Sequence, residues 1–294
     1  MPANIREIKG RMKAVKNIQR ITKTMQLIAS ARFQAMLKKA TQGQAYADKI
    51  QAMVGQVAGA IAGDDSVGEQ PLLMPPAESP NKTLVLVLTS DRGLCGSYNT
   101  NVMKLARQEI SETPSRFEVV GKKGIGFAKF NKIDVDRAHL EFGDNPKYEQ
   151  VAALADRLMQ EFAAGQYDAV KVVYTRFLSM SKQTPETLQL LPLADPGSDE
   201  GDATEAGASA AYEFSPEPGQ LLEALLPASV KVTLMRCFND AAVSEQLARM
   251  VAMKAATDAA GKQGKALKRQ FNRARQTAIT TELSEIIAGA AALE

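Results

Sequence analysis

The sequence predicts a mixed α+β and α/β fold, in which two long terminal helices pair as an antiparallel coiled coil around an inserted Rossmann-like α/β domain. Two observations predict this arrangement. Apolar residues recur every three or four positions near both ends of the chain, and strand-like segments alternate with helical ones between them. With 294 residues, 45% of them apolar and 23% charged, the chain is long enough for one large domain or two smaller ones.

The first predicted helix covers residues 1–62. Asn4 and Glu7 have the spacing of a capping box, which marks a helix start, and no proline lies between Pro2 and Pro71. An apolar seam runs along this helix, and we expect it to pack on the C-terminal helix. The seam consists of Ile5, Ile8, Met12, Val15, Ile18, Ile21, Met25 and Ile28.

A linker rich in Gly, Pro and acidic residues is predicted at 63–82, followed by a compact α/β domain at 83–193. Strands and helices alternate within this domain. They are a buried strand at 83–91, a helix to about 112, a strand at 116–121, a short helix around Phe127, a strand near Ile133, a helix at 147–164, a strand at 169–177 and a possible edge strand at 187–193.

An acidic loop is predicted at 194–218 and a second long helix at 219–294. Pro227 should kink this helix, and Gly261 and Gly264 should weaken it. Each terminal helix is much longer than the α/β domain is wide. Because a lone helix is unstable in water, we expect the two to pair through their apolar seams.

The ends of the chain are basic and its middle is acidic. Residues 1–39 hold ten Lys or Arg residues and a single acidic one, Glu7. The cations Lys9, Lys13, Lys16, Arg20 and Lys23 gather away from the apolar seam. Such a stripe fits DNA, an anionic membrane or an acidic protein partner. The chain has no tryptophan and the stripe no interleaved aromatic residues, so an acidic protein is favoured, with a nucleic-acid-binding arm as the alternative.

The stretch from Ile286 to Leu293 carries no charge on any side of the predicted helix. It is far shorter than the roughly 20 residues that cross a bilayer, and the N-terminus does not resemble a signal peptide. We therefore expect a cytoplasmic protein whose apolar helix end is covered by another protein.

Catalytic and metal-binding signatures are weak. Cys95 and Cys237 lie far apart, which fits a reducing compartment, and His139 is the only histidine. The segments SDRGLCGS at 90–97 and GKKGIG at 121–126 match neither a P-loop nor a dinucleotide fingerprint, so both are predicted to be turns. An enzyme acting through Cys95 is a distant alternative, and no cofactor or metal is predicted.

Three segments together resemble the gamma subunits of F-type ATP synthases. They are NIQRITKTMQLIAS near the start, SDRGLCGSYNTN after the first strand, and the long C-terminal segment from RMVAMKAATD to the end. The resemblance covers the whole chain. It implies a non-catalytic rotor shaft, one copy per complex, whose coiled coil turns inside a ring of alpha and beta subunits. The α/β domain then forms a foot near the membrane c-ring and the epsilon subunit. ATP synthesis is thereby coupled to hydrogen ion transport at the cytoplasmic face of a bacterial inner membrane.

The resemblance also implies roles for individual residues. Met25, Arg275, Gln276, Thr280 and Arg249 match positions that contact the alpha and beta subunits. We add Lys16, Arg20 and Lys23, and the helix-end residues Ile286 and Ile287, to these contacts. In YEFSPEP, the expected c-ring contacts are Tyr212, Glu213 and Phe214. The chain lacks the close cysteine pair of plant-type relatives, so thiol regulation is not expected.

Overall fold

A computed structural model describes residues 5–60, 72–74, 82–193 and 217–291. The expectations for Asn4, for nearly all of the 63–82 linker, for the 194–216 part of the acidic loop and for Tyr212, Glu213 and Phe214 lie outside these residues. The chain separates into two compact units, Met1–Ala31 with Arg249–Glu294 and Arg32–Ala248. Helices α1 (Ile5–Ala60) and α5 (Pro218–Ala291) each contribute to both units. The inner parts of the two long helices therefore belong with the sheet rather than with the helical unit.

The larger unit is built on a five-stranded sheet with the order β3-β2-β1-β4-β5. The first four strands are parallel, and β5 pairs antiparallel with β4. The strands are β1 (Thr83–Leu88), β2 (Ser115–Val120), β3 (Arg137–His139), β4 (Ala169–Phe177) and β5 (Gln183–Leu191). Pro185 lies in β5, where an edge strand tolerates a residue without an N–H group.

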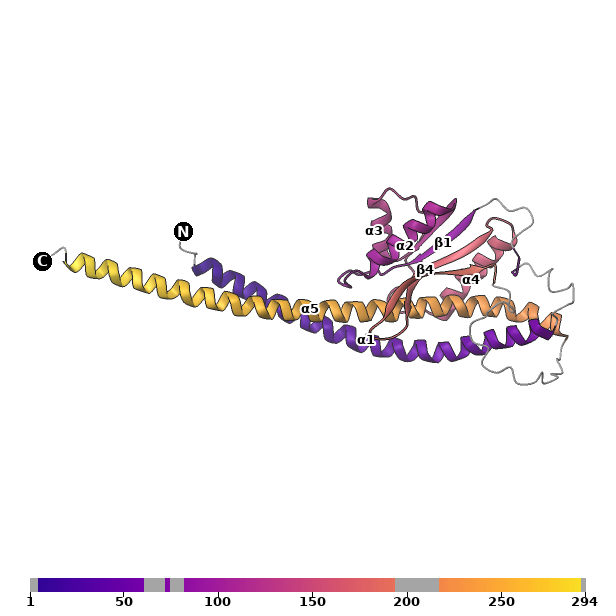
Figure 1. The fold of residues 1–294 in the computed structure, drawn as a ribbon, viewed down its shortest axis with the longest axis horizontal. Helices are drawn as coiled ribbons and strands as arrows, with labels where there is room; N and C mark the ends of the chain where they lie inside the picture. The colour runs from indigo at the N-terminus through magenta and orange to yellow at the C-terminus, as the bar shows by residue number, and fades with distance from the viewer. Residues whose placement is uncertain (1–4, 61–71, 75–81, 194–216, 292–294) are drawn as a thin grey trace. The chain divides into compact units, whose positions relative to one another are not determined.

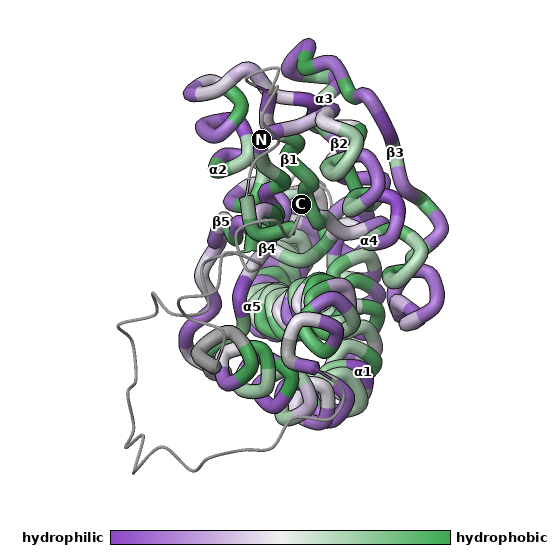
Figure 2. Tube along the Cα trace, turned by 90° about the vertical axis from the view of Figure 1, so that its right-hand side faces the viewer, coloured by the Kyte–Doolittle hydropathy of each residue, from purple (hydrophilic) through white to green (hydrophobic). Residues whose placement is uncertain are grey.

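Helices cover both faces of this sheet, which explains why β1 is a continuous apolar run rather than an alternating one (Figure 2). Leu84, Leu86 and Leu88 pack on the face covered by α4 (Tyr148–Ala163) and α5. Val85 and Val87 pack on the other face, which α2 (Tyr98–Glu112) and α3 (Lys122–Phe130) cover (Figure 1). The predicted alternation of helices and strands is thereby confirmed.

The strand predicted near Ile133 begins four residues later than expected. Residues 131–136 form a turn and a loop, and the short strand β3 begins only at Arg137. Ile133 and Val135 are apolar because they pack from this loop onto the α2–α3 face of the sheet. The Asp136 carboxylate accepts a hydrogen bond from the Phe117 backbone N–H, at 2.8 Å, which attaches the loop to β2. Burial, rather than strand pairing, produced the strand-like pattern.

Helix α5 is continuous through Pro227, Gly261 and Gly264. Leu222, Leu226 and Val230 are all buried on either side of the proline, so tertiary packing outweighs the lost hydrogen bond. Gly261 lies where α1 comes close. A Cβ added there would be 3.1 Å from the Gln19 side-chain nitrogen.

The smaller unit is an antiparallel pair formed by the outer parts of α1 and α5. Three contacts give its register. Val15 lies opposite Gly264 and Gln19 opposite Gly261, while the Thr257 hydroxyl donates to the Thr22 hydroxyl at 2.8 Å. On α1 the residues that face α5 keep strict alternating steps of four and three. They are Ile8, Met12, Val15, Gln19, Thr22, Gln26 and Ala29.

The predicted seam is therefore wrong at Ile18, Ile21 and Ile28. Ile18, Ile21 and Ile28 are 51%, 56% and 50% exposed. Successive steps of three from Val15 turn away from the partner helix, because three residues cover less than one helical turn. The real seam passes instead through polar Gln19 and Thr22, whereas Met25 beside it is half-buried.

Inside the larger unit, α5 places ionisable groups against β4. Tyr174 and Cys237 are buried, and Asp240 lies beside them. Burial raises the pKa of Asp240 from 3.8 to about 6, despite the opposing charges of Arg236 and Arg176. Burial likewise raises the pKa of the Cys237 thiol to about 12. These groups are therefore easier to bury in their protonated forms.

We expect Val15→Ala to destabilise the chain by about 1–2 kcal/mol, because it leaves a cavity in the seam. Ile18→Ala is the matched control, and it should change stability by less than about 0.5 kcal/mol because that side chain is exposed. Urea unfolding followed by circular dichroism measures both. Equal costs for the two variants would contradict the seam described above.

Asp240 should make stability fall as pH rises from about 4 to about 6. Over this interval the folded state holds a proton on Asp240 that the unfolded state has released, so raising the pH favours unfolding. Asp240→Asn should remove this part of the pH dependence and stabilise the chain at pH 7. Urea unfolding at several pH values measures the slope, and Asp134→Asn on the surface provides the control. An unchanged slope in Asp240→Asn would count against the raised pKa.

Candidate functional site

The carboxyl edge of a parallel sheet is the usual ligand site of this fold, and here the chain's own groups occupy it. The first backbone N–H groups of α3 are already bound. Lys122 N donates to the Asp91 carboxylate at 3.0 Å, Lys123 N to the Ser90 carbonyl at 3.0 Å, and Gly124 N to the Thr89 hydroxyl at 2.9 Å. These are the donors that would otherwise hold a phosphate.

The glycines of GKKGIG serve this internal packing. Gly121 has φ +93°, and a Cβ there would lie 2.3 Å from the Thr89 carbonyl oxygen. At Gly124 a Cβ would lie 2.5 Å from a Val119 methyl carbon. Both glycines are needed because α3 approaches β1 and β2 closely. The predicted turn at 121–126 is thus mainly the first part of α3.

Helix α5 lies over the point where the strand order reverses, between β1 and β4. The Tyr98 hydroxyl, at the start of α2, donates to the Ala241 carbonyl at 3.1 Å. The Ser244 hydroxyl donates to the Thr175 carbonyl of β4 at 3.3 Å. A dinucleotide-binding protein keeps this crevice open for its ligand. Here α5 fills the equivalent position.

Cys95 does not form a catalytic pair with His139. Cys95 is 2% exposed, and its sulfur accepts a hydrogen bond from the Asn99 side-chain amide at 3.2 Å. Both ring nitrogens of His139 face carboxylates instead, Glu118 at 2.9 Å and Glu141 at 3.0 Å. Within the described residues no group of His, Cys, Asp and Glu side chains could hold a metal ion.

The helical pair offers the more distinctive surface, beginning with its basic face. Lys9, Lys13, Lys16, Arg20 and Lys23 are all exposed. Among the described residues, none of these five forms an ion pair with a carboxylate, whereas Arg11 pairs with Glu7. Several like charges on one helix face repel one another, so an anionic surface opposite them would be stabilising.

A second exposed face of α1 is apolar. It consists of Ile18, Ile21 and Ile28 and lies on the side of the seam away from the cations. Sequence reasoning placed these residues in the seam. The signal that separates them is the strict heptad spacing, which continues through polar residues and excludes them. The helix pair therefore carries an apolar face and a cationic face, and both are open to solvent.

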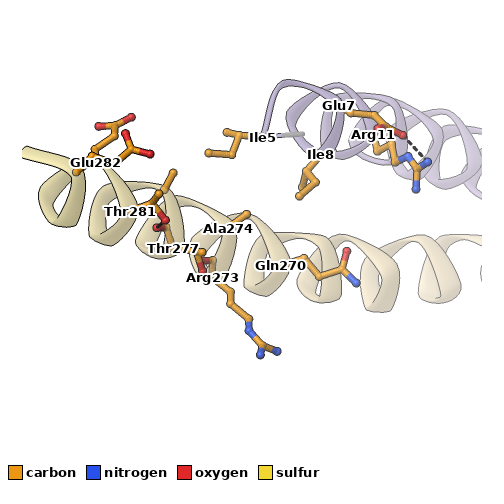
Figure 3. Close-up of a pocket in the computed structure, with 12 residues that line it drawn as sticks. Ile5, Glu7, Ile8, Arg11, Gln270, Arg273, Ala274, Thr277, Thr281 and Glu282 are labelled. Atoms are coloured by element: carbon orange, nitrogen blue, oxygen red, sulfur yellow. Dashed lines mark hydrogen bonds and ion pairs between the residues drawn. The ribbon is translucent and has the colours of Figure 1, made fainter. Parts of the chain in front are cut away.

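The paired region ends where α1 begins. The register places Ile5 near Ala274, and the described part of α5 continues to Ala291. A groove of about 760 Å³ lies here, between the first turns of α1 and residues 270–285 of α5. In Figure 3, Ile8 extends from α1 toward α5, and Glu7 pairs with Arg11 beside the groove.

Away from the groove-lining side, α5 is exposed from Arg275 onward. Arg275, Gln276 and Thr280 have no α1 residue opposite them in the described chain, and Ile286 and Ile287 are 68% and 61% exposed. The Thr280 hydroxyl is bound to the Gln276 carbonyl of its own helix at 3.0 Å. This segment is a helix with charged, polar and apolar side chains all facing water.

The two remaining predicted contact residues, Arg249 and Met25, are less exposed than the others. Arg249 is only 6% exposed, so little of its side chain is accessible to a second protein. Its contact with the alpha and beta subunits stays a prediction. Met25 is half-buried at the edge of the seam. No helix within the described ranges is long and apolar enough to cross a membrane.

Comparison with known proteins gives one consistent result. The ATP synthase family model matches residues 4–293. The ATP synthase gamma chain of Rhodopirellula baltica is 42% identical over 99% of this chain and 99% of that protein. The gamma chain of Gemmatimonas aurantiaca is 36% identical over 98% of each chain.

Solved structures with the same fold come from mitochondrial ATP synthases. One is a chain of the Euglena gracilis OSCP/F1/c-ring assembly, with a TM-score of 0.67, 17% identity, and coverage of 98% of this chain and 94% of that one. Another, from the Tetrahymena thermophila central stalk and c-ring, has a TM-score of 0.57, 20% identity, and coverage of 80% and 99%. These two likenesses concern the fold. The near-complete family match and the relative at 42% identity show that this chain belongs to the family of ATP synthase gamma chains.

Proposed function

We propose that this chain is the non-catalytic central rotor shaft of a proton-translocating F-type ATP synthase. It transmits rotation between the membrane c-ring and the alpha3beta3 catalytic ring, to drive ATP synthesis or hydrolysis. The observation that carries this proposal is the helical pair. Its exposed faces differ in chemistry, and α5 continues beyond the first described residue of α1.

A shaft with unlike faces can control several identical subunits around it. At any one angle, one subunit meets the cationic face, another meets Ile18, Ile21 and Ile28, and a third meets the outer side of α5. Each face of the shaft binds one conformation of a subunit more tightly than another, and this difference in affinity shifts the conformational equilibrium of that subunit. The three subunits are therefore stabilised in different conformations. Turning the shaft moves each contact to the next subunit.

The cationic face suits acidic loops of the beta subunits. Lys16, Arg20 and Lys23 are exposed and have no carboxylate partner among the described residues. Long-range attraction to such loops is effective because no carboxylate in the described parts of α1 and α5 pairs with these cations. Half-buried Met25 lies near the same loops in this proposal.

The end of α5 turns in an apolar sleeve formed by the ring. Ile286 and Ile287 expose apolar surface near this end, and such a surface makes no ion pair that would favour one angle. Arg275, Gln276 and Thr280 contact a beta-subunit loop just before this end. Their exposure leaves them accessible for that role.

The sheet domain forms the foot, near the c-ring and the epsilon subunit. One relative of the same fold is described as part of a rotor and another as part of a central stalk with its c-ring, which supports this assignment. The contacts through Tyr212, Glu213 and Phe214 remain a prediction. We place one copy per complex at the cytoplasmic face of a bacterial inner membrane.

Absence of catalysis by the chain itself is part of the proposal. The donors at the carboxyl edge of the sheet bind the chain's own Asp91, Ser90 and Thr89, and α5 covers the crevice between β1 and β4. The nucleotide chemistry therefore belongs to the partner subunits.

Co-purification tests the function directly. The tagged chain should isolate with an alpha and beta ring that hydrolyses ATP, and a bead attached to the sheet domain should rotate during hydrolysis. Binding to duplex DNA with a steep salt dependence, and no associated ATPase, would overturn the proposal in favour of a nucleic-acid-binding arm.

The paired substitution Ile286→Asp and Ile287→Asp should prevent stable assembly with the ring, because two carboxylates would be buried in an apolar sleeve. The control is Ile286→Ala with Ile287→Ala, which keeps the helix end uncharged and should still assemble. Size-exclusion chromatography of the reconstituted complex measures both. Normal assembly of the Asp variant would contradict the sleeve.

Replacing Lys16, Arg20 and Lys23 by Gln should lower ATPase activity of the assembled ring about threefold or more, by removing three charge contacts worth roughly 0.2–1 kcal/mol each. Neutralising Lys104, Arg107 and Lys129 is the matched control, because these cations are exposed on α2 and α3. Steady-state ATP hydrolysis at low salt measures the effect. Equal losses in both triple variants would show that only net charge matters.

A further inference from the structure

Residues 139–147, which we call the strap, join the end of β3 to the start of α4 and contact five other parts of the larger unit. The strap reaches the sheet through His139, α5 through Phe142, and α1 through Asp144 and Pro146. Asp144 also lies 3.9 Å from Arg92 in the loop after β1, and the Glu141 carbonyl accepts from Gln150 of α4. A nine-residue segment thus meets both long helices and the sheet.

At the sheet end of the strap, His139 lies between two carboxylates. Its Nε2 is 2.9 Å from the Glu118 carboxylate of β2, and its Nδ1 is 3.0 Å from the Glu141 carboxylate. The Glu118 side chain is only 3% exposed, and Arg157 of α4 binds both of its oxygens. A buried carboxylate with these partners stays ionised, and an ionised carboxylate only accepts hydrogen bonds.

Glu141 is half exposed, and although burial alone would raise its pKa, hydrogen bonds lower it, so this second carboxylate is ionised as well. Because both carboxylates beside the ring accept hydrogen bonds, both ring nitrogens of His139 carry a proton, which makes the ring an imidazolium. The surrounding charges agree with this. The ring contacts Glu118 of β2 and Glu141 of the strap, and an ion-pair network continues from Glu118 through Arg157 and Glu161 of α4 to Arg137 of β3. Three carboxylates and two guanidiniums leave one negative charge, which a protonated His139 neutralises.

The middle of the strap packs on α5. Phe142 is buried, and its ring centroid is 4.7 Å from that of Phe238 on α5 and 6.1 Å from that of His139. Gly143 follows with φ +57°, a conformation that L side chains rarely adopt, and it turns the chain toward α1. The position of Phe142 therefore depends on the residues that fix His139 beside it.

The far end of the strap binds α1. Arg32 donates to the Asp144 carboxylate, and Lys39 donates to the Pro146 carbonyl at 2.7 Å. These two cations are seven positions apart, so they lie on the same side of the helix two turns from each other. The strap holds this side of α1 at two points.

We propose that the strap holds α1 and α5 to the sheet domain, and that imidazolium His139 is the positioning residue that keeps the strap in place. His139 contacts no substrate or partner subunit in this proposal. It acts through the strap, and its charge determines how firmly the strap is held.

The proposal carries a pH dependence with a definite sign. Burial alone would lower the pKa of His139, but hydrogen bonds and charges from Glu118 and Glu141 outweigh it and raise the pKa above 6.5. A raised folded-state pKa means that the stabilisation is fully present below pH 6.5 and is lost as pH rises through the folded-state pKa. The strap should therefore loosen on the alkaline side.

If the chain is a rotor shaft, as proposed above, the strap would transmit torque between the sheet domain and the two long helices. This consequence rests on the proposed function. The strap itself is a property of this chain and is tested without rotation or ATP. Failure of the chain to bind an ATPase ring would leave the measurements below unaffected.

Nitrogen NMR of the full chain labelled with ¹⁵N-histidine tests the charge directly, because His139 is the only histidine. Both ring nitrogens should show the shifts of a protonated imidazolium at pH 7. A neutral ring with one protonated nitrogen at pH 7 would overturn the proposal. This measurement needs no variant and so does not depend on a variant folding.

Hydrogen exchange tests the strap. In His139→Gln, a neutral amide cannot satisfy both carboxylates, so exchange of amides in 137–151 should rise about tenfold or more at pH 7. Exchange in the α1 stretch 32–39 should rise with it. Lys129→Gln is the matched control, because it removes one exposed positive charge and should leave both regions unchanged.

Two outcomes of the exchange experiment would overturn the proposal. Exchange in 137–151 that stays within twofold of the unmodified chain would show that His139 does not hold the strap. Faster exchange there with an unchanged 32–39 stretch would show that the strap does not hold α1.

Discussion

The rest of the structure depends on the antiparallel seam between the outer parts of α1 and α5. Long helices are unstable alone in water, so each must bury one face against the other, and this requirement fixes which side chains remain outside. Once Val15 and Leu267 occupy the seam, Ile18 and the cations are left exposed on opposite sides of α1. The pairing of the two helices therefore determines which cationic and apolar surfaces of α1 are available to a partner protein.

In the larger unit, the chain's own side chains and helix α5 occupy the ligand site that this fold usually has. A parallel sheet offers N–H groups and a crevice at its carboxyl edge. In this chain Asp91 takes the place of an anion at the start of α3, while Tyr98 and Ser244 bind across the crevice to α5 and β4. The edge of the sheet where related folds bind small molecules is used here to bind helix α5.

Much of this could be predicted from the sequence, because local patterns determine it. The apolar run at β1 and the spacing of α4 predicted the α/β alternation, and the absence of proline predicted the length of α1. Ile133 misled because a loop that packs on a core has the same composition as a strand. Ile18 and Ile21 misled because hydrophobicity alone does not say which of two adjacent helix faces is covered. The role of the strap could not be predicted at all, since its contact partners Arg32, Glu118 and Phe238 are brought to it only by tertiary structure.

The hydrogen bond between the Thr22 and Thr257 hydroxyls determines how much of α5 is left unpaired with α1. A seam made only of interchangeable apolar residues tolerates a slip of one heptad, whereas a hydrogen-bonded polar layer has its partner in only one alignment. A slip of seven residues would change the unpaired stretch of α5 by about 10 Å, at ~1.5 Å per residue. The Thr22 and Thr257 side chains thus fix the alignment of the two helices, and with it the length of α5 that continues beyond the first described residue of α1.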